Sequence, residues 1–126
     1  KIEKVFLHLF TDGRDSPQYA SLKLVDDLEK HFFNNEIIAT IMGRYYAMDR
    51  KKNWKNTKMA YESLVSGKGL KAQNPQEAIT ESYNRGESDE FIQPYLIGDY
   101  KESRIKDGDS VIFFNLGSDR GRQLTK

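Results

Sequence analysis

A chain of 126 residues is enough for one compact domain and leaves little room for a second, so we expect residues 1–126 to form a single domain. Hydrophobic residues make up 37% of the chain and charged residues 31%, a balance typical of a small folded domain rather than a disordered segment. The net charge of +1 provides no overall attraction to nucleic acid or to an anionic membrane, so any anion-binding site must be local.

Several residue types and patterns are missing from the chain. Without cysteine there is neither a disulfide framework nor a thiolate metal site, as in proteins of the reducing cytoplasm. No apolar run approaches the roughly 18 residues that a membrane-spanning helix needs, and the first ten residues do not form a signal peptide. We therefore expect a cytoplasmic protein without membrane or nucleic-acid partners. Strand-like residues begin almost at once without an initiator Met, which suggests a domain excised from a longer protein.

The first half of the chain predicts two strands with a helix between them. The apolar run at 5–10 (VFLHLF) is typical of a buried strand. Ser16-Pro17 forms a good N-cap and first turn for a helix over about 17–33, where apolar residues recur at helical spacing. The run at 36–41 (EIIATI) predicts a second strand, and Gly43 then opens a loop over 43–50 (GRYYAMDR).

Two more helices are expected in the middle of the chain. Residues 52–65 have a helical pattern, in which Trp54 is expected to pack in the core, and Gly67 ends it. Asn74-Pro75-Gln76-Glu77 has the form of a helix start, because Asn caps, Pro fits the first turn and Glu77 can reach back toward the cap. This helix should continue to Gly86.

The last third predicts a short extended piece at 93–97, a turn at 106–109 and a third apolar strand at 110–114 (SVIFF). A further helix is expected to begin near Ser118 or Asp119. Strands that alternate with helices indicate an α/β fold with a mainly parallel sheet and helices on both faces, a three-layer, Rossmann-like arrangement.

Each of the three predicted strands is followed at once by a loop that contains Gly and Arg, namely DGRD at 12–15, GRYYAMDR at 43–50 and NLGSDR at 115–120. Ligands of open parallel sheets bind outside the carboxyl ends of the strands. The loops should therefore bring four arginines to one crevice: Arg14, Arg44, Arg50 and Arg120. Gly beside Arg would let the backbone come close to a bulky anion.

The arginine side chain suits such a crevice, because its planar fork binds carboxylate or phosphate through two parallel hydrogen bonds. Only seven of the 20 basic residues are Arg, and five of these seven lie in or just after the three loops. The pattern predicts a pocket for a small molecule with several negative groups. The structural alternative for any one arginine is an exposed ion pair that contributes little.

Asp15 is the acidic residue with the most chemical options. It could orient Arg14, accept a hydrogen bond from a substrate hydroxyl or act as a general base, and its structural alternative is to cap the following helix. Asp12 is expected to form the turn before Gly13. His8 is expected to be a hydrogen-bonded core residue, and two separated histidines without cysteine make a poor metal site.

Four segments closely resemble, in order, consecutive motifs of the cofactor-independent phosphoglycerate mutases: HLFTDGRDSP, IMGRYYAMDR, SYNRGESDEFIQP and DGDSVIFFNLGSDRGRQLT. The similarity covers nearly the whole chain. It implies the substrate-binding (transferase) domain of a two-domain isomerase. Such an enzyme interconverts 2- and 3-phosphoglycerate in glycolysis through a phosphoserine intermediate.

The resemblance also implies roles for the loop residues. Arg14 and Asp15 would contact the hydroxyls and carboxylate of the glycerate, with Asp15 as a proton shuttle. Arg44 and Arg50 would hold the carboxylate and the negative charge, and Arg120 would face the phosphate. The nucleophilic serine and two manganese ions are implied for a phosphatase-like domain of the same polypeptide. The full-length protein is expected to be a monomer. The 126-residue part is expected to bind no metal and to be inactive alone.

One position departs from the family pattern, because Gly117 stands where the family usually has an arginine that pairs with the equivalent of Arg120. The departure leaves two alternatives open. The first is a related two-domain phosphotransferase acting on another phosphorylated hydroxy acid or sugar. The second is a non-enzymatic anion-binding or regulatory module.

Overall fold

The computed structural model describes residues 2–99 and 101–126. Its centre is a four-stranded sheet in the order β1-β2-β4-β3. Strand β1 (Val5–Thr11) runs parallel to β2 (Glu36–Gly43), and β3 (Leu70–Ala72) runs parallel to β4 (Tyr95–Ile97). Only the β2–β4 pairing in the middle is antiparallel. The sheet is therefore mixed but mainly parallel, as the sequence predicts.

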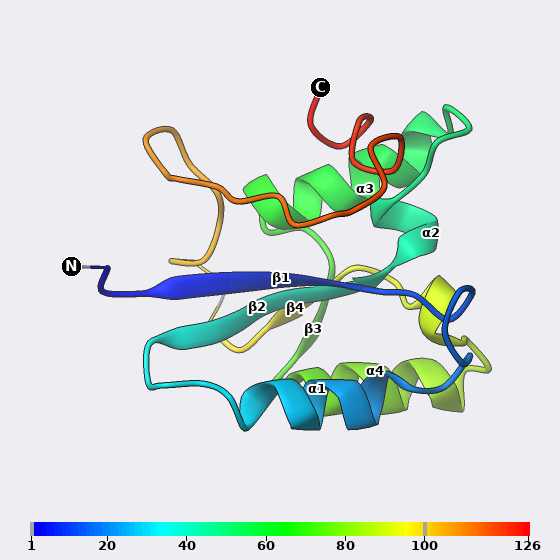
Figure 1. Cartoon of the computed structure of the whole chain (residues 1–126), viewed down its shortest axis with the longest axis horizontal. Helices are drawn as coiled ribbons and strands as arrows, with labels where there is room; N and C mark the ends of the chain where they lie inside the picture. Colours follow the sequence, from blue (N-terminus) through cyan, green and yellow to red (C-terminus); the bar gives the residue numbers. More distant parts are fainter. Residues whose placement is uncertain (1, 100) are drawn as a thin grey trace.

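Helices cover both faces of this sheet. Figure 1 shows α1 (Ser21–Glu29) and α4 (Pro75–Asn84) side by side below it, and α3 (Trp54–Val65) above it, preceded by the short α2 (Arg44–Ala47). The expected three-layer α/β architecture is confirmed. No helix in the described ranges is long and apolar enough to cross a membrane.

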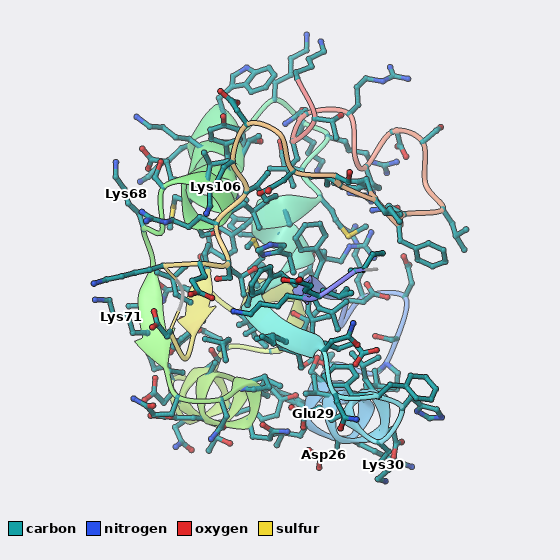
Figure 2. All side chains as sticks on the ribbon, turned by 90° about the vertical axis from the view of Figure 1, so that its left-hand side faces the viewer. Asp26, Glu29, Lys30, Lys68, Lys71 and Lys106 are labelled. Carbon is teal, nitrogen blue, oxygen red and sulfur yellow. The ribbon has the colours of Figure 1, made fainter. Side chains whose placement is uncertain are left out.

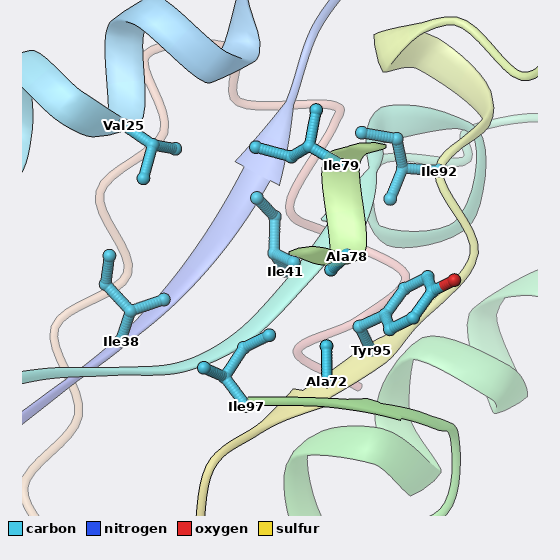
Figure 3. Packing of buried hydrophobic residues seen from close by; sticks show 9 residues of the cluster. All are labelled: Val25, Ile38, Ile41, Ala72, Ala78, Ile79, Ile92, Tyr95 and Ile97. Atoms are coloured by element: carbon cyan, nitrogen blue, oxygen red, sulfur yellow. The ribbon is translucent and has the colours of Figure 1, made fainter. Parts of the chain in front are cut away.

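A separate hydrophobic cluster lies on each face of the sheet. The cluster between the sheet and the helices α1 and α4 includes Val25 and Ile79, which Figure 3 shows on the helices, and Tyr95, which it shows on β4. The cluster beneath α3 includes Met42, Ala60 and Leu64. Ile41 and Met42 are neighbours in β2 that enter different clusters, because successive strand residues point to opposite faces.

The start of α4 follows its sequence signature. Asn74 Oδ1 accepts a hydrogen bond from the Glu77 N–H at 2.8 Å, and Pro75 is the first helical residue. The Glu77 carboxylate reaches back to the N–H of Gln73, at 2.8 Å, one residue before the cap.

Three expectations in the first half need correction. Helix α1 begins at Ser21 rather than near residue 17, and Ser16 does not cap it, because its hydroxyl accepts the Gly13 N–H at 3.1 Å. The segment after Gly43 is not all loop, since its first residues form α2. Trp54 is 52% exposed and not a core residue, because α3 turns smaller and mostly polar side chains inward: Asn56, Thr57, Ala60, Ser63 and Leu64.

The last third differs more from expectation. The turn at 106–109 is confirmed by the Asp109 N–H to Lys106 carbonyl bond of 3.1 Å, and the extended piece at 93–97 contains β4. Residues 110–114, however, form no strand in the described structure, and 118–126 form turns instead of a helix. Only Phe113 of this run stacks on a strand residue, with its ring centroid 6.0 Å from that of Phe10. An apolar run becomes a strand only where a neighbouring strand supplies hydrogen bonds.

Candidate anion-binding site

The loops that carry the predicted arginines do meet at one edge of the sheet. Arg14 follows the end of β1, and Arg44 is the first residue of α2, directly after β2. Because β1 and β2 are parallel, both strands end on the same side, which is the right side of Figure 1. The sheet topology thus places Arg14 and Arg44 together as the sequence predicts.

Arg44 is the best-anchored member of the group, with a side chain only 6% exposed. Its Nη1 donates to Asp12 and, at 2.7 Å, to Asp15 Oδ2. Burial lowers the pKa of Arg44, but the hydrogen bonds to these carboxylates outweigh it and raise the pKa, so the guanidinium stays charged. Its Nε and Nη2 have no acceptor among the described residues, and no buried side-chain nitrogen there lacks a partner, so both reach solvent.

Asp12 forms the expected turn, because its Oδ1 accepts the N–H groups of Arg14 and Asp15, both at 3.3 Å. Its contact with Arg44 joins the β1 and β2 loops and is missing from the sequence prediction. Burial raises the pKa of Asp12, but hydrogen bonds from Arg44 and from the two backbone groups outweigh it, so the pKa lies below its ordinary value.

Asp15 is exposed and does not cap α1, which begins six residues later. It contacts Arg44 and not Arg14, whose nearest carboxylate is Glu90 at 3.8 Å. The second oxygen of Asp15, Oδ1, receives no hydrogen bond within the described ranges. An exposed carboxylate oxygen next to a fixed guanidinium can accept a ligand hydroxyl.

Arg50 and Arg120 also lie at this edge, but hydrogen bonds between loops place them there instead of the predicted third strand. Arg50 Nη1 donates to Asp119 Oδ2 at 2.7 Å, and Arg120 Nη1 donates to the Met48 carbonyl at 3.2 Å. Gln123 Nε2 adds a bond of 2.7 Å to Asp49 Oδ2. The C-terminal segment is therefore held against the loop after α2, although residues 110–114 of the described chain form no strand before it.

The charges of the four arginines act on one another. Burial lowers the pKa of Arg120, and the positive charges of Arg44, Arg50 and Arg14 lower it further. Figure 2 views the left side of Figure 1, where β1 and β2 begin, and shows four lysines on that side, away from these arginines: Lys30, Lys68, Lys71 and Lys106. We call the four residues Arg14, Arg44, Arg50 and Arg120 the arginine cluster.

Four carboxylates surround the arginine cluster: Asp12, Asp15, Glu90 and Asp119. The equal numbers of positive and negative groups keep the region nearly neutral in formal charge. An incoming anion therefore competes with acidic side chains, most directly at the half-exposed Arg50–Asp119 pair.

The glycines of these loops have a packing role. A Cβ on Gly43 would lie 2.2 Å from the Glu90 carbonyl oxygen, and one on Gly13 would lie 2.7 Å from the Glu90 nitrogen. Gly13 also has a φ of +67°. Protein backbone, rather than a ligand, accounts for these close approaches. The sequence gives no local signal for the turn at Asp89–Phe91 that makes them.

Other residues considered from the sequence have structural roles. His8 Nδ1 lies 2.9 Å from Thr40 Oγ1, and partial burial in β1 lowers the pKa of His8; the hydrogen bond is as expected, but the residue is half-buried and not in the core. Tyr45 and Tyr46 pack edge to face with centroids 5.1 Å apart. No group of three or more His, Cys, Asp or Glu side chains in the described part of the chain is arranged to hold a metal ion.

Fold and site together define a three-layer α/β domain with an arginine cluster at the carboxyl ends of its parallel strands. The family described as BPG-independent PGAM N-terminus matches residues 1–126. The chain belongs to this family.

Individual relatives agree with this assignment. The chain is 50% identical over 127 residues to the 2,3-bisphosphoglycerate-independent phosphoglycerate mutase of Clostridium kluyveri, covering 98% of this chain and 25% of the relative. It is 48% identical to a Methanosarcina barkeri enzyme of the same name, with the same coverage. A phosphoglycerate mutase structure from Leishmania mexicana superposes with a TM-score of 0.87 at 26% identity, over 98% of this chain and 25% of that one. The chain thus spans about a quarter of the length of these relatives.

Proposed function

We propose that this chain is the substrate-binding (transferase) domain of a phosphoglycerate mutase that interconverts 2- and 3-phosphoglycerate in glycolysis through a phosphoserine intermediate. The observation that carries the proposal is the arginine cluster, whose members come from separate segments of a chain in this family. A phosphorylated hydroxy acid has a carboxylate and a phosphate, two anionic groups that suit guanidinium forks.

In this proposal Arg44 provides the fixed point for the substrate. Its Nη1 is bound to Asp12 and Asp15, and Nε and Nη2 remain for the substrate carboxylate. Arg14 and Arg50, both exposed, close on the glycerate, and Arg120 faces the phosphate. A guanidinium that is already fixed loses less conformational entropy when it binds an anion.

Asp15 is proposed to shuttle a proton. Its Oδ2 is bound to Arg44, and its exposed Oδ1 can accept the proton of a glycerate hydroxyl as that oxygen takes up the phosphoryl group. The phosphoryl group itself moves through a serine outside residues 1–126, and two manganese ions are assigned to the same phosphatase-like domain. No metal is assigned to the residues of this chain.

The rest of the polypeptide is the proposed partner of the C-terminal segment. Ile112 and Phe114 are each 90% exposed and Leu116 is 97% exposed, an unusual placement for three large apolar side chains so close in sequence. A domain that docks on this segment would cover these side chains and lie next to Arg120. The complete protein is proposed to be a cytoplasmic monomer.

The test measures conversion of 3- to 2-phosphoglycerate by the complete polypeptide and its Arg44→Lys variant. We expect turnover by the complete protein and a loss of at least about tenfold in kcat/KM for Arg44→Lys, because ammonium does not reproduce the guanidinium fork. The matched control Arg104→Lys should retain activity. Absence of mutase turnover in the complete protein would contradict the proposal, as would turnover by residues 1–126 alone.

A second candidate is a phosphotransferase acting on another phosphorylated hydroxy acid or sugar, and the observation in its favour is Gly117 in place of the family's usual arginine. Turnover of 2-phosphoglycerate by the complete protein should be compared with turnover of phosphosugars. Higher kcat/KM for a phosphosugar would favour the second candidate.

A further inference from the structure

The turn η1 (Asp89–Phe91) connects to the arginine cluster without belonging to its loops. Asp89 is only 1% exposed. Its Oδ2 accepts the N–H groups of Ala20 at 2.9 Å and Ser21 at 3.0 Å, and its Oδ1 accepts the Tyr83 hydroxyl at 2.5 Å. Because a buried carboxylate is costly unless it is hydrogen-bonded, these three donors fix the place of Asp89.

The backbone of this turn and of Ile92, the residue after it, holds the carboxyl ends of both parallel strands. Thr11, the last residue of β1, donates its hydroxyl proton to the Asp89 carbonyl at 2.6 Å. Gly43, the last residue of β2, donates its N–H to the Ile92 carbonyl at 2.7 Å. The Asp89 N–H donates in turn to the Gln18 carbonyl at 2.9 Å. These bonds join the two segments from which Arg14 and Arg44 extend.

The fit between the turn and these loops is tight. Gly13 and Gly43 touch the backbone of residues 89–90 so closely that neither has room for a Cβ. The Glu90 side chain also lies 3.8 Å from Arg14. A displacement of Asp89 would therefore move the loops of both strands.

We propose that Asp89 is a positioning residue that sets the spacing between Arg14 and Arg44, and through it the affinity of the arginine cluster for phosphoglycerate. The inference rests on the proposed function of the arginine cluster. Asp89 is buried beneath the loops and acts on the ligand only through the segments that it binds. Burial, followed by the hydrogen bond to Asp89, raises the pKa of Tyr83 well above its usual value, so the hydroxyl remains a donor.

The experiment uses the complete polypeptide with Asp89→Asn, which keeps the shape and removes the charge, and with Tyr83→Phe, which removes one donor. At a temperature where circular dichroism shows both variants folded, we expect Asp89→Asn to raise KM and the calorimetric Kd for 3-phosphoglycerate by about tenfold or more, since small displacements at a binding site are costly. Tyr83→Phe should change both constants in the same direction by less.

Two comparisons separate positioning from simple stabilisation. Asn74→Ala removes the cap of α4, which should lower the melting temperature and leave KM unchanged. In a double-mutant cycle, the effects of Asp89→Asn and Arg14→Lys on Kd should be non-additive, because both act through the same loop. A folded Asp89→Asn variant with unchanged KM, or an additive cycle, would overturn the positioning role.

The outcome also distinguishes this inference from the proposed function. If Arg14→Lys and Arg44→Lys weaken binding and the Asp89 and Tyr83 variants do not, the positioning role of Asp89 is wrong and the proposed function stands. If the two arginine variants leave Kd unchanged, the proposed function of the arginine cluster is wrong, and positioning falls with it.

Discussion

Arg50 and Asp119 are joined by a 2.7 Å hydrogen bond although 69 residues separate them in sequence. The pair connects the loop after α2 to the C-terminal segment, and both side chains are about half exposed. The hydrogen bond from Arg50 lowers the pKa of Asp119, so the carboxylate is charged at neutral pH. Asp119 is therefore already hydrogen-bonded to the Arg50 guanidinium, which the proposed substrate would need to bind.

Neutralising this competitor should strengthen ligand binding. We expect Asp119→Asn to lower the Kd of the complete polypeptide for 3-phosphoglycerate by about two- to fivefold, the range that corresponds to one exposed ion pair. Calorimetric titration provides the measurement, and Asp107→Asn, in an exposed turn, serves as the matched control. Weaker binding by Asp119→Asn would mean that Asp119 supports the site instead of competing for it.

Gly117 is the position where an added side chain should improve the site. The three atoms nearest to an added Cβ would all belong to side chains, with Arg120 Cγ closest at 3.3 Å, and Gly117 lines a shallow hollow with Phe113, Asn115 and Ser118. We expect Gly117→Arg to fold normally and to lower the Kd for 3-phosphoglycerate several-fold, by an amount that decreases with added salt. Unchanged affinity at low salt would show that this position does not face the phosphate.

Gly43 should be the least tolerant glycine of the site. A Cβ there would lie 2.2 Å from a backbone oxygen of Glu90, which cannot rotate away as a side chain does. We expect Gly43→Ala to lower the free energy of unfolding by about 3 kcal/mol, as overpacked buried positions do. Gly117→Ala should change it by less than about 0.5 kcal/mol. Urea unfolding monitored by circular dichroism compares the two variants, and equal effects would contradict the packing at the Asp89–Phe91 turn.

His8 should make stability depend on pH. Burial lowers the pKa of His8 below 6.5, so the unfolded chain binds a proton more readily than the folded chain as the pH falls. Stability should therefore decrease from about pH 7 downward, through the unfolded pKa and toward the folded one. Melting temperatures of His8→Gln should show a weaker decrease over this range, whereas the exposed His31→Gln should keep it. A decrease of the same size in His8→Gln would exclude this cause.

Elements with local signals could be predicted from the sequence. Strands β1 and β2 follow from their apolar runs, and the start of α4 follows from Asn74-Pro75. These signals can be read locally, because each depends only on residues that are neighbours in the sequence. The three-residue strand β3 is too short to show a period. Residues 110–114 have the composition of a strand but no paired neighbour in the described structure.

The candidate site shows the same division. Arg14 and Arg44 could be brought together from the rule that ligands bind at the carboxyl ends of parallel strands. The contacts that hold their loops in place could not be predicted. The hydrogen bonds of Asp89 with Ala20 and Ser21 span 69 and 68 residues and leave no local pattern in the sequence. The pairing of Asp15 with Arg44 instead of its neighbour Arg14 likewise depends on how two loops meet.

The most direct test of the arginine cluster follows each guanidinium while the ligand binds. The complete polypeptide, with ¹⁵N label confined to residues 1–126, is titrated with 3-phosphoglycerate and the arginine Nε–Hε resonances are recorded. We expect the resonances of Arg14, Arg44, Arg50 and Arg120 to shift together with one common Kd, while those of Arg85, Arg104 and Arg122 change little. Shifts spread evenly over all seven arginines, or absent from the four, would contradict this expectation.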